Sequence, residues 1–377
     1  MKKICYVVTK SITIKAFFIP QLKYLAQNGY SVSVICSPDD ELGAMLGDNI
    51  RFLPVEMPRG LSVLGSIKAI SKLKKIFKKE KFDLVQYSTP NASLYASIAS
   101  KKAGIKVRNY HLTGLRYLGA QGIFRKILKF IEKKALKNST HVECECQSNL
   151  DFCIKEKLFS KDKAVIVGYG SAGGIDLSRF DIEKAKEYRT EKRRFYAIKD
   201  NEIVFGFVGR ITKDKGIEEL VKAFNMLSQQ ISNIKLVIVG GLDQNNNLSK
   251  DVLSEIENNQ SIIKINATPE IEKYYPMLDV LVLPSYREGF GNVVIEAEAM
   301  GVPVIVSNIP GPVDAMEDGK TGLIFTVKDV LALSNAMQKA LGFDKSYKER
   351  AVKFARERFD SNLLNKEILK RKNKLLG

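Results

Sequence analysis

The second half of the sequence contains a glycine-rich segment with two positive charges. It runs from Gly206 to Gly216 and carries Arg210 and Lys215 where an apolar run gives way to a helical pattern. Glycine allows a ligand to approach the backbone closely, and the first turn of a helix presents free N–H groups to an anion. The segment therefore predicts a phosphate-binding site, with two solvated cations beside a turn as the alternative interpretation.

A second glycine-rich segment follows the apolar run 280–284 and contains acidic residues. Glu288 precedes Gly289 and Gly291, and Glu296 lies on the next predicted helix. The glycines leave the first amides of that helix open to a diphosphate, which a carboxylate would repel. The two glutamates therefore fit the neutral parts of a ligand, because a carboxylate accepts strong hydrogen bonds from hydroxyls such as the two of a ribose. The segment predicts a ligand that joins a diphosphate to sugars.

Both segments lie in a chain that alternates short β-branched runs with longer helical patterns. The predicted strands are 4–8, 31–36, 84–87, 106–110, 141–146, 164–167, 203–208, 235–239, 262–265, 280–283 and 304–306. The predicted helices are 14–28, 62–80, 91–103, 122–137, 147–157, 216–231, 249–258, 269–277, 292–300 and a charged tail at 345–376. Such alternation is typical of βαβ units on a parallel sheet.

The length of 377 residues predicts two domains, and the glycine-rich and then charged stretch 168–200 is interpreted as their connection. The expected fold class is α/β, with two Rossmann-like, doubly wound domains that face each other across a cleft. In such sheets ligands bind beyond the carboxyl ends of the strands. Both glycine-rich segments fall at such ends.

Charge divides the chain unevenly. Lys and Arg exceed Asp and Glu by 18, and residues 1–200 hold 37 basic against 19 acidic residues, whereas the rest is balanced. A Lys-rich proteome would explain a high total but not its confinement to one half, so the first half is expected to meet a polyanion. No apolar run suits a signal peptide or a spanning helix, and the five cysteines show no paired spacing, which predicts a cytoplasmic protein.

Taken together, the motifs resemble the signature of the retaining family 4 glycosyltransferases of GT-B fold. The matching residues are Gly209, Arg210, Lys215, Gly216, Pro284, Ser285, Glu288, Gly289, Phe290, Gly291 and Glu296, followed by Asp314-Ala315 and the run from Asp318 to Leu323. The resemblance covers nearly the whole chain. It implies that the C-terminal helix crosses back to the first domain, so that one domain comprises 1–170 with about 345–377 and the other 171–344.

The resemblance also implies that the second domain binds a sugar nucleotide. Arg210 and Lys215 would neutralise the diphosphate, Glu296 would hold the ribose, and Glu288 would position the donor sugar. The base would lie near Gly240, Gly241 and the 266–268 loop. The donor-binding candidates are Gly209, Gly240, Gly241, Ala267, Thr268, Gly289, Phe290, Gly291, Asn292 and Glu296, and the catalytic candidates are Arg210, Lys215, Glu288 and His111.

The first half contributes further candidates. His111 follows a predicted strand and matches the family's cleft histidine, although a lone histidine is often structural. The segment 168–176 resembles the interdomain motif of capsule and O-antigen transferases, with Gly173 where Asn is common. Thr9–Ser11 stands where many members have a glycine pair that cradles the diphosphate. The candidates for acceptor or interdomain contacts are Ser11, Ser171, Gly173 and Gly174.

The sequence contains no Asp-x-Asp motif, so neither a metal nor another cofactor is expected. Metal-dependent glycosyltransferases hold the diphosphate through a cation bound by that motif, whereas Arg210 and Lys215 would supply the positive charge here. The resemblance implies retention of the anomeric configuration, by same-face displacement in which the leaving phosphate accepts the proton of the acceptor.

Two predicted helices combine an apolar face with a basic face. On 122–137 the apolar arc consists of Ile123, Phe124, Ile127, Leu128, Phe130, Ile131 and Ala135, and the basic face of Arg125, Lys126, Lys129, Lys133 and Lys137. Residues 67–79 repeat the pattern. One interpretation is a core helix with a solvated back. The other, favoured by the excess charge, is a domain that binds an anionic membrane surface.

These inferences predict an enzyme that moves a sugar from a UDP-linked hexose or N-acetylhexosamine to a saccharide on a polyprenyl-diphosphate carrier, in surface polysaccharide synthesis. Its partners would be the donor, the lipid-linked acceptor and the anionic inner face of the cytoplasmic membrane, with no nucleic acid. One alternative is a GT-B-fold sugar-nucleotide epimerase, for which two histidines offer few acid/base groups. Another is a basic nucleic-acid-binding protein, which would leave both glycine-rich segments unexplained.

Overall fold

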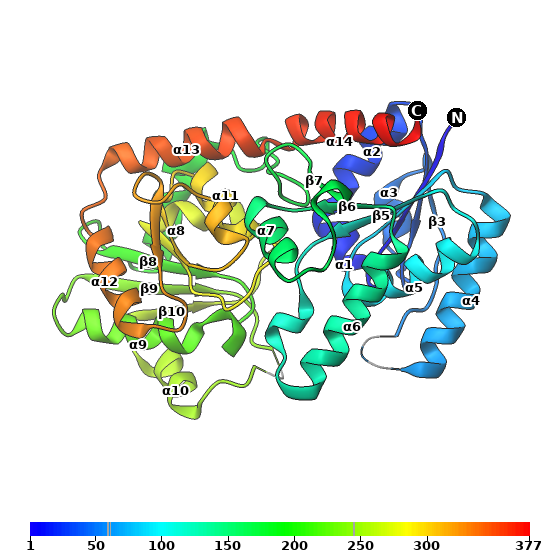
Figure 1. Cartoon of the computed structure of the whole chain (residues 1–377). Coiled ribbons are helices and arrows are strands. Elements are labelled where there is room, and N and C mark those ends of the chain that lie inside the picture. The colour runs from blue at the N-terminus through cyan, green and yellow to red at the C-terminus, as the bar shows by residue number, and fades with distance from the viewer. Residues whose placement is uncertain (59, 61, 244–245) are drawn as a thin grey trace. The chain divides into compact units, whose positions relative to one another are not determined.

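The structure is a computed structural model that describes residues 1–58, 60, 62–243 and 246–377. It consists of two compact units, each with a parallel sheet and covering helices (Figure 1). Unit 1 contains Met1–Gly174 and Ser361–Gly377, and unit 2 contains Ile175–Asp360. The chain therefore enters unit 2 slightly after the expected boundary at 170/171, and it returns to unit 1 at Ser361 instead of at 345.

Unit 1 is built on a seven-stranded parallel sheet in the order β3-β2-β1-β4-β5-β6-β7. Its strands are β1 (Lys3–Val7), β2 (Ser31–Ile35), β3 (Ile50–Phe52), β4 (Leu84–Tyr87), β5 (Val107–Leu112), β6 (His141–Cys144) and β7 (Ala164–Ile166). Its helices are α1 (Ser11–Thr13), the π-helix η1 (Ile14–Phe18), α2 (Ile19–Gln27), α3 (Leu42–Leu46), α4 (Val63–Glu80), α5 (Pro90–Lys102), α6 (Gly122–Asn138), α7 (Gln147–Lys155) and α14 (Ser361–Leu376), with 3₁₀ turns η2 (Arg116–Gly119) and η3 (Lys161–Lys163). The order of strand addition reverses between β1 and β4.

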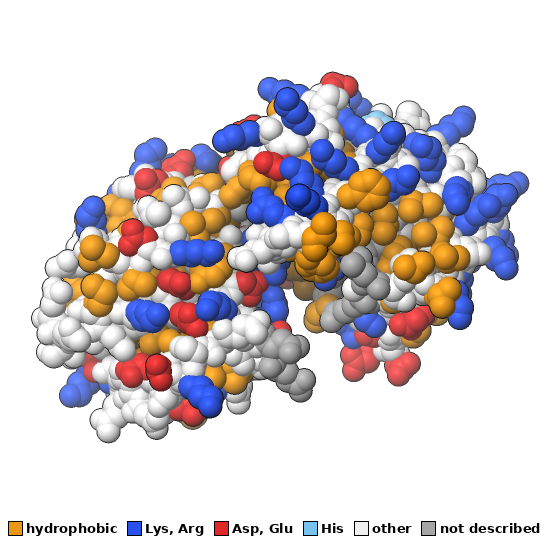
Figure 2. Space-filling view, turned by 60° about the horizontal axis from the view of Figure 1, so that its bottom comes forward, with side chains coloured by type: hydrophobic (Ala, Val, Ile, Leu, Met, Phe, Trp, Pro, Cys, Tyr) orange, Lys and Arg blue, Asp and Glu red, His pale blue; other side chains and the backbone are white. Residues whose placement is uncertain are grey.

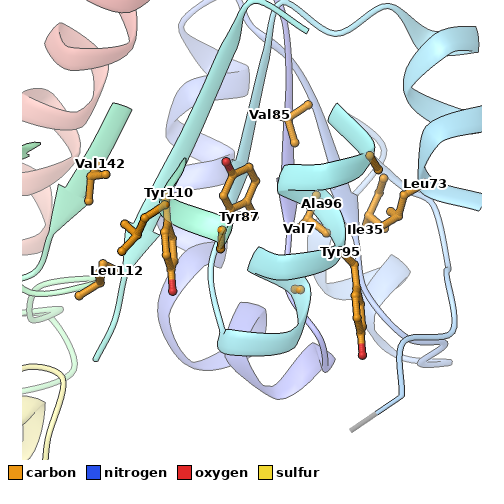
Figure 3. Packing of buried hydrophobic residues seen from close by; sticks show 14 of the residues in the cluster. Val7, Ile35, Leu73, Val85, Tyr87, Tyr95, Ala96, Tyr110, Leu112 and Val142 are labelled. Carbon is orange, nitrogen blue, oxygen red and sulfur yellow. The ribbon is translucent and has the colours of Figure 1, made fainter. Parts of the chain in front are cut away.

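The sheet of unit 1 is buried on both faces, because successive side chains of a strand point to opposite sides. Val7 of β1 belongs to a cluster that includes Leu73 of α4 and Tyr95 of α5, as Figure 3 shows. Tyr6, on the other side of the same strand, belongs to a cluster that includes Leu364 of α14. The C-terminal helix is therefore part of the core of unit 1, as the implied return of the chain requires.

Unit 2 repeats the design with six parallel strands in the order β10-β9-β8-β11-β12-β13. The strands are β8 (Ile203–Val208), β9 (Ile234–Val239), β10 (Ile262–Ile265), β11 (Val280–Leu283), β12 (Val304–Ser307) and β13 (Gly322–Phe325). The helices are α8 (Ala185–Phe195), α9 (Ile217–Ser228), α10 (Lys250–Asn258), α11 (Asn292–Ala299), α12 (Val330–Ala340) and α13 (Lys345–Phe359), with 3₁₀ turns η4 (Ile182–Lys184), η5 (Lys213–Lys215), η6 (Ile271–Lys273), η7 (Tyr275–Met277) and η8 (Pro312–Asp314). Here the order reverses between β8 and β11, which makes this the topological switch point of the sheet.

Several predicted elements differ from the structure for local reasons. The helix expected over 14–28 is divided into η1 and α2, with Pro20 near the junction, where proline offers no N–H to the regular helical ladder. The helix expected over 269–277 is two short 3₁₀ turns, one of which contains Pro276. The tail expected as one helix is broken at Asp360, whose backbone is not helical. The expected linker 168–200 contains α8, whose Arg193 forms an ion pair with Asp279 at 2.6 Å.

Candidate functional site

The switch point of unit 2 brings the two glycine-rich segments together. β8 and β11 are hydrogen-bonded neighbours, so the loops that follow them lie side by side at the carboxyl edge of the sheet. Gly216, with φ 74°, closes the first loop, and a Cβ atom there would lie 2.1 Å from the carbonyl oxygen of Pro284. Only glycine permits this approach. The sequence predicted two separate binding segments, and in the structure they form one site.

A partly buried ion pair joins the two loops. Lys215 Nζ lies 2.5 Å from Glu288 Oε1, and Ser285 Oγ donates to the same carboxylate oxygen at 2.7 Å. Arg210 is more exposed and pairs with Asp243 at 3.2 Å. Because Lys215 neutralises Glu288, a diphosphate can lie beside this carboxylate without net repulsion.

Asp214 forms hydrogen bonds within the first loop and to the second loop. It was not among the residues predicted from the sequence. Its carboxylate accepts from Thr212 Oγ1 at 2.6 Å and from Arg287 at 2.8 Å, and its carbonyl oxygen accepts from the amide of Tyr286 at 2.9 Å. Burial raises the pKa of Asp214, but the hydrogen bond from Thr212 and the charge of Arg287 outweigh it, so the net pKa is lowered. The signal in the sequence that could have identified Asp214 is its position between Lys213 and Lys215.

The loops after β9 and β10 complete the carboxyl edge. A Cβ atom on Gly240 would lie 1.7 Å from the carbonyl oxygen of Gly209, so both backbones depend on the absence of that side chain. Gly241 has open space beside its Cα and accepts from the amide of Ile211 at 2.9 Å. Ala267 and Thr268 follow β10, and Ala267 is exposed. Their strands place these candidates along one edge.

The start of α11 is held by a core anchor and a tight turn. Phe290 is buried and its ring packs against Phe359 at 5.3 Å, so its side chain faces the interior. Gly291 caps α11 with φ 91°, directly before Asn292, and Gly311 approaches Gly289 so closely that a Cβ would lie 2.8 Å from its carbonyl oxygen. The role expected for residues 289–292 depends on backbone amides and is compatible with this packing.

Glu296 lies on α11 and is partly buried. Tyr275 donates its hydroxyl hydrogen to Glu296 Oε2 at 2.7 Å. Burial raises the pKa of Glu296, although Tyr275 and Arg179 act in the opposite direction. The hydrogen bond fixes one edge of the carboxylate, as a group that positions a ribose would require.

The corresponding switch point of unit 1 carries hydroxyl groups. Thr9 follows β1 and Thr89 follows β4, and their Oγ1 atoms lie 2.8 Å apart. Thr89 has φ 69°, which a β-branched residue adopts only when its surroundings require it. Ser11 Oγ donates to Asp39 at 2.5 Å, next to Lys15. Ser11, a candidate for acceptor contacts, is thus engaged with a carboxylate of the β2–α3 loop.

His111 ends β5 and is 8 % exposed. Its Nδ1 lies 3.2 Å from Ser88 Oγ, and its ring packs edge-on against Phe18 at 5.6 Å. Burial lowers the pKa of His111 to about 4, with Glu143 opposing and Lys372 reinforcing the shift. The imidazole is therefore neutral near pH 7 and can act only as a neutral donor or acceptor.

A buried polar network lies behind His111. Lys372 of α14 is 1 % exposed and lies 3.0 Å from Glu143 Oε2 and 2.6 Å from Gln86 Oε1. Gln86 also accepts from Asn109 at 2.8 Å. Burial would raise the pKa of Glu143, but the charge of Lys372 and its hydrogen bond hold that pKa below its usual value. The C-terminal helix thus supplies the charge that compensates a carboxylate beside His111.

The 171–174 turn packs against the π-helix. A Cβ atom on Gly173 would lie 2.7 Å from the carbonyl oxygen of Phe17, which explains why this chain has no side chain where Asn is common. Ser171, at φ 70°, accepts from the amide of Gly174 at 3.1 Å. This turn is therefore a packed element of unit 1, directly before the chain enters unit 2.

The amphipathic arc of α6 divides into two parts. Leu128 and Ala135 are buried, as a core helix requires, but Ile123 and Phe130 are 73 % and 69 % exposed. Phe124 and Ile127 are also exposed. The interpretation of the arc as a face that packs wholly on the core is therefore wrong. Among the basic residues, Lys129 is paired with Glu156 at 2.5 Å.

The described residues contain no group of three or more His, Cys, Asp or Glu side chains that could hold a metal ion. No helix in the described part of the chain has the length and apolar character needed to cross a membrane.

Two Rossmann-like units in one chain, each with its switch point at the carboxyl edge, are the architecture of the GT-B fold, which solved glycosyltransferase structures share with this chain. The family comparisons agree: residues 188–358 match the family model "Glycosyl transferases group 1", and residues 3–145 match "Glycosyl transferase 4-like". The chain belongs to the glycosyltransferases and is an enzyme of that class.

Three similar proteins illustrate the match. The capsular polysaccharide biosynthesis glycosyltransferase CapM of Staphylococcus aureus is 29% identical over 97% of this chain and 94% of its own. A UDP-Gal:alpha-D-GlcNAc-diphosphoundecaprenol alpha-1,3-galactosyltransferase of Escherichia coli is 25% identical over 85% of this chain and 82% of its own. The crystal structure of a glycosyltransferase from Rickettsia africae shares the fold, with a TM-score of 0.80 and 22% identity over 100% of this chain and 98% of its own.

Proposed function

We propose that this glycosyltransferase transfers a sugar from a nucleotide-diphosphate sugar, a UDP-linked hexose or N-acetylhexosamine, to a saccharide carried on a polyprenyl diphosphate. Transfer would retain the anomeric configuration and need no metal. The observation that carries the proposal is the Lys215–Glu288 pair at the switch point of unit 2, with Arg210 on the adjoining loop.

The residues of unit 2 support distinct roles toward the donor. Arg210 and Lys215 would stabilise the charge that develops on the departing diphosphate, which is the task of a metal ion in enzymes that have an Asp-x-Asp motif. Glu288, oriented by Ser285, would accept from hydroxyls of the donor sugar. Glu296, fixed by Tyr275, would accept from the ribose. Neutral His111 in unit 1 would contact the donor sugar without adding charge.

The acceptor class and the biological role are supported by the relatives. The Escherichia coli relative is named for an acceptor on diphosphoundecaprenol, and the Staphylococcus aureus relative for capsular polysaccharide biosynthesis. We therefore propose an acceptor saccharide on a polyprenyl-diphosphate carrier and a role in surface polysaccharide synthesis.

Peripheral binding to the inner face of the cytoplasmic membrane is part of the proposal. By its sequence, unit 1 holds 34 Lys and Arg against 14 Asp and Glu, whereas unit 2 holds 26 against 28. Hydrophobic side chains gather on the surface of unit 1 that faces the viewer in Figure 2, with Lys and Arg around them. Helices α4 and α6 of unit 1 expose several large apolar side chains to solvent. These are Val63, Leu64, Ile67, Ile123, Phe124, Ile127 and Phe130. Apolar residues within a basic rim favour an anionic lipid surface.

The test is transfer itself. The purified protein is incubated with a panel of UDP-sugars and a synthetic N-acetylglucosaminyl diphosphate lipid, with and without a chelator. We expect one donor to give a product whose anomeric configuration by NMR equals that of the donor, at equal rates in both buffers. An inverted product, or activity that requires added Mg²⁺ or Mn²⁺, would contradict the mechanism. No transfer and no hydrolysis of any donor would contradict the proposed donor class.

A further inference from the structure

A cavity of about 260 Å³ lies in unit 1 between α4, α5 and α6. Its apolar wall includes Val63 and Ile67 of α4, Leu94 of α5, and Leu128 and Ile131 of α6. Pockets that hold a whole drug-sized ligand measure roughly 300–1,000 Å³. This cavity is smaller, so it fits an apolar segment of a larger molecule.

The polar groups in the wall of the cavity are already bonded to the protein. The hydroxyl group of Tyr95 lies 3.1 Å from Ser66 Oγ. Glu132 accepts from the hydroxyl group of Tyr110 at 2.6 Å, and burial raises the pKa of this carboxyl group to about 7. Groups that are satisfied in this way do not require a polar ligand. The inner part of the cavity is therefore suited to hydrocarbon.

One cation, Arg116, lines the cavity. Arg116 begins the η2 turn that follows β5, so it lies toward the same carboxyl edge as His111. It donates to Asn91 Oδ1 at 3.3 Å, and no carboxylate in the described part of the chain lies within ion-pair distance of it. A guanidinium group has five N–H donors and matches phosphate geometry. Arg116 is therefore available for a phosphate group.

From this arrangement we infer that the cavity holds the first isoprene units of the acceptor, with the acceptor diphosphate on Arg116. The inference rests on the proposed function, since it deepens the assignment of a polyprenyl-diphosphate acceptor. The order of groups fits such a molecule: the sugar would lie near His111, the diphosphate at Arg116 and the hydrocarbon between the helices. The exposed residues Val63 and Ile67 at the rim then lead the remaining chain toward the lipid phase.

The neighbouring groove supplies a matched control. It measures about 730 Å³, shares Ile67 with the cavity, and is lined by Lys74, Lys101, Lys102 and Lys134. These lysines can attract anions, but they do not line the smaller cavity. A variant of Lys101 therefore tests whether general positive charge, rather than the cavity with Arg116, determines binding.

The experiment is calorimetric titration of the full chain with inorganic diphosphate, isopentenyl diphosphate and farnesyl diphosphate. Saturating UDP is present throughout, so that the proposed donor site is occupied. We expect farnesyl diphosphate to bind at least about tenfold more tightly than isopentenyl diphosphate, because the longer chain buries more apolar surface. Dodecyl phosphate serves as the probe for an unbranched saturated alkyl chain and should bind more weakly than farnesyl diphosphate.

Four variants sharpen the test. Ser66→Phe fills the cavity and should abolish the advantage of farnesyl over isopentenyl diphosphate, and Ile67→Glu, at a 59 % exposed position that tolerates change, should reduce it. Arg116→Gln should weaken all the diphosphates by about tenfold and leave the dependence on chain length intact. Lys101→Gln should change neither property.

Opposite results overturn the inference. Equal affinity for the three diphosphates would exclude the cavity as the binding site of the isoprene units. A chain-length advantage that persists in both Ser66→Phe and Ile67→Glu would exclude it as well. Equal affinity for dodecyl phosphate would assign the cavity to lipid chains in general. These outcomes leave the proposed function intact if sugar transfer to the diphosphate lipid still occurs. Loss of transfer with every donor, together with normal farnesyl diphosphate binding, would contradict the proposed function instead.

Discussion

The six strands of unit 2 repeat the order of the first six strands of unit 1, but the two units place different chemistry at the same topological point. In unit 2 the loops at the switch point carry Gly216, the Lys215–Glu288 pair and Arg210. In unit 1 the corresponding loops carry the Thr9–Thr89 hydroxyl pair. The fold therefore decides where a ligand can lie, and the loop residues decide which ligand it is.

Charge separates the units as clearly as the loops do. Unit 1 has a net charge of +20 and unit 2 of −2, from the same residues of the sequence counted above. Unit 2, which carries Arg210 and Lys215, is thus nearly neutral overall, and its positive charges are local. The excess charge of unit 1 is spread over exposed helices, as expected for contact with an extended anionic surface. Four experiments can break or sharpen this comparison.

The largest effect is expected from the basic face of α6. Replacing Arg125, Lys126, Lys133 and Lys137 by Gln removes about 1 kcal/mol of attraction per residue to an anionic leaflet at low salt. Sedimentation with anionic vesicles should be lost, and neutral vesicles should bind neither protein. The matched control is Lys129→Gln, which should have little effect because Glu156 already neutralises Lys129. Unchanged vesicle binding by the fourfold variant would mean that the basic face of α6 is solvated and does not contact lipid.

The second effect concerns the cations of unit 2. Arg210→Ala should slow transfer by about 2–4 kcal/mol of transition-state stabilisation, the loss expected for one preorganised donor. The turnover number at saturating donor is the measurement, because the loss affects the chemical step. Wild-type turnover in this variant would remove Arg210 from the diphosphate site. The vesicle binding of this variant should be unchanged, since its charge lies in the other unit.

The sequence predicted the parts of this site that depend on local pattern. The strands β8 and β11 and the glycines of their loops follow from short apolar runs and turn residues. The partner of Lys215 could not be predicted, because it depends on which strands are neighbours. The same holds for Lys372 and Glu143, which are 229 positions apart.

Other elements escaped prediction because their signals are short or incomplete. The strand β3 has three residues, too few to show a period of two. The exposure of Phe130 depends on how far the neighbouring helices cover α6, which a helical wheel does not contain. The need for glycine at 173 arises from the carbonyl group of Phe17 in the irregular π-helix.

The third effect separates binding from chemistry within unit 2. Glu296→Ala removes a carboxylate that would accept from the ribose, and hydrogen bonds to charged groups contribute about 1.5–3 kcal/mol each. UDP should bind about 10- to 100-fold more weakly by calorimetry, whereas turnover at saturating donor should change less than in Arg210→Ala. Tyr275→Phe is a milder control, since it keeps the carboxylate and removes only the hydrogen bond that orients it. Equal UDP affinity in Glu296→Ala and wild type would exclude the ribose assignment.

The smallest effect tests the buried network of unit 1 through its pH dependence. His111 faces Glu143 of β6 and Lys372 of α14, and burial lowers its pKa to about 4, below the ordinary value near 6.5. Between these values the unfolded chain binds a proton at this position that the folded chain excludes, so the stability of the folded protein falls as the pH falls. Relative to His111→Gln, the wild type should lose about 1–2 kcal/mol of unfolding free energy between pH 7.5 and pH 5, measured by urea denaturation at both values. The contribution of His141 is common to both proteins and cancels. Parallel stability profiles would mean that His111 is charged or solvated in the folded chain, and the neutral role toward the donor sugar would then have to be abandoned.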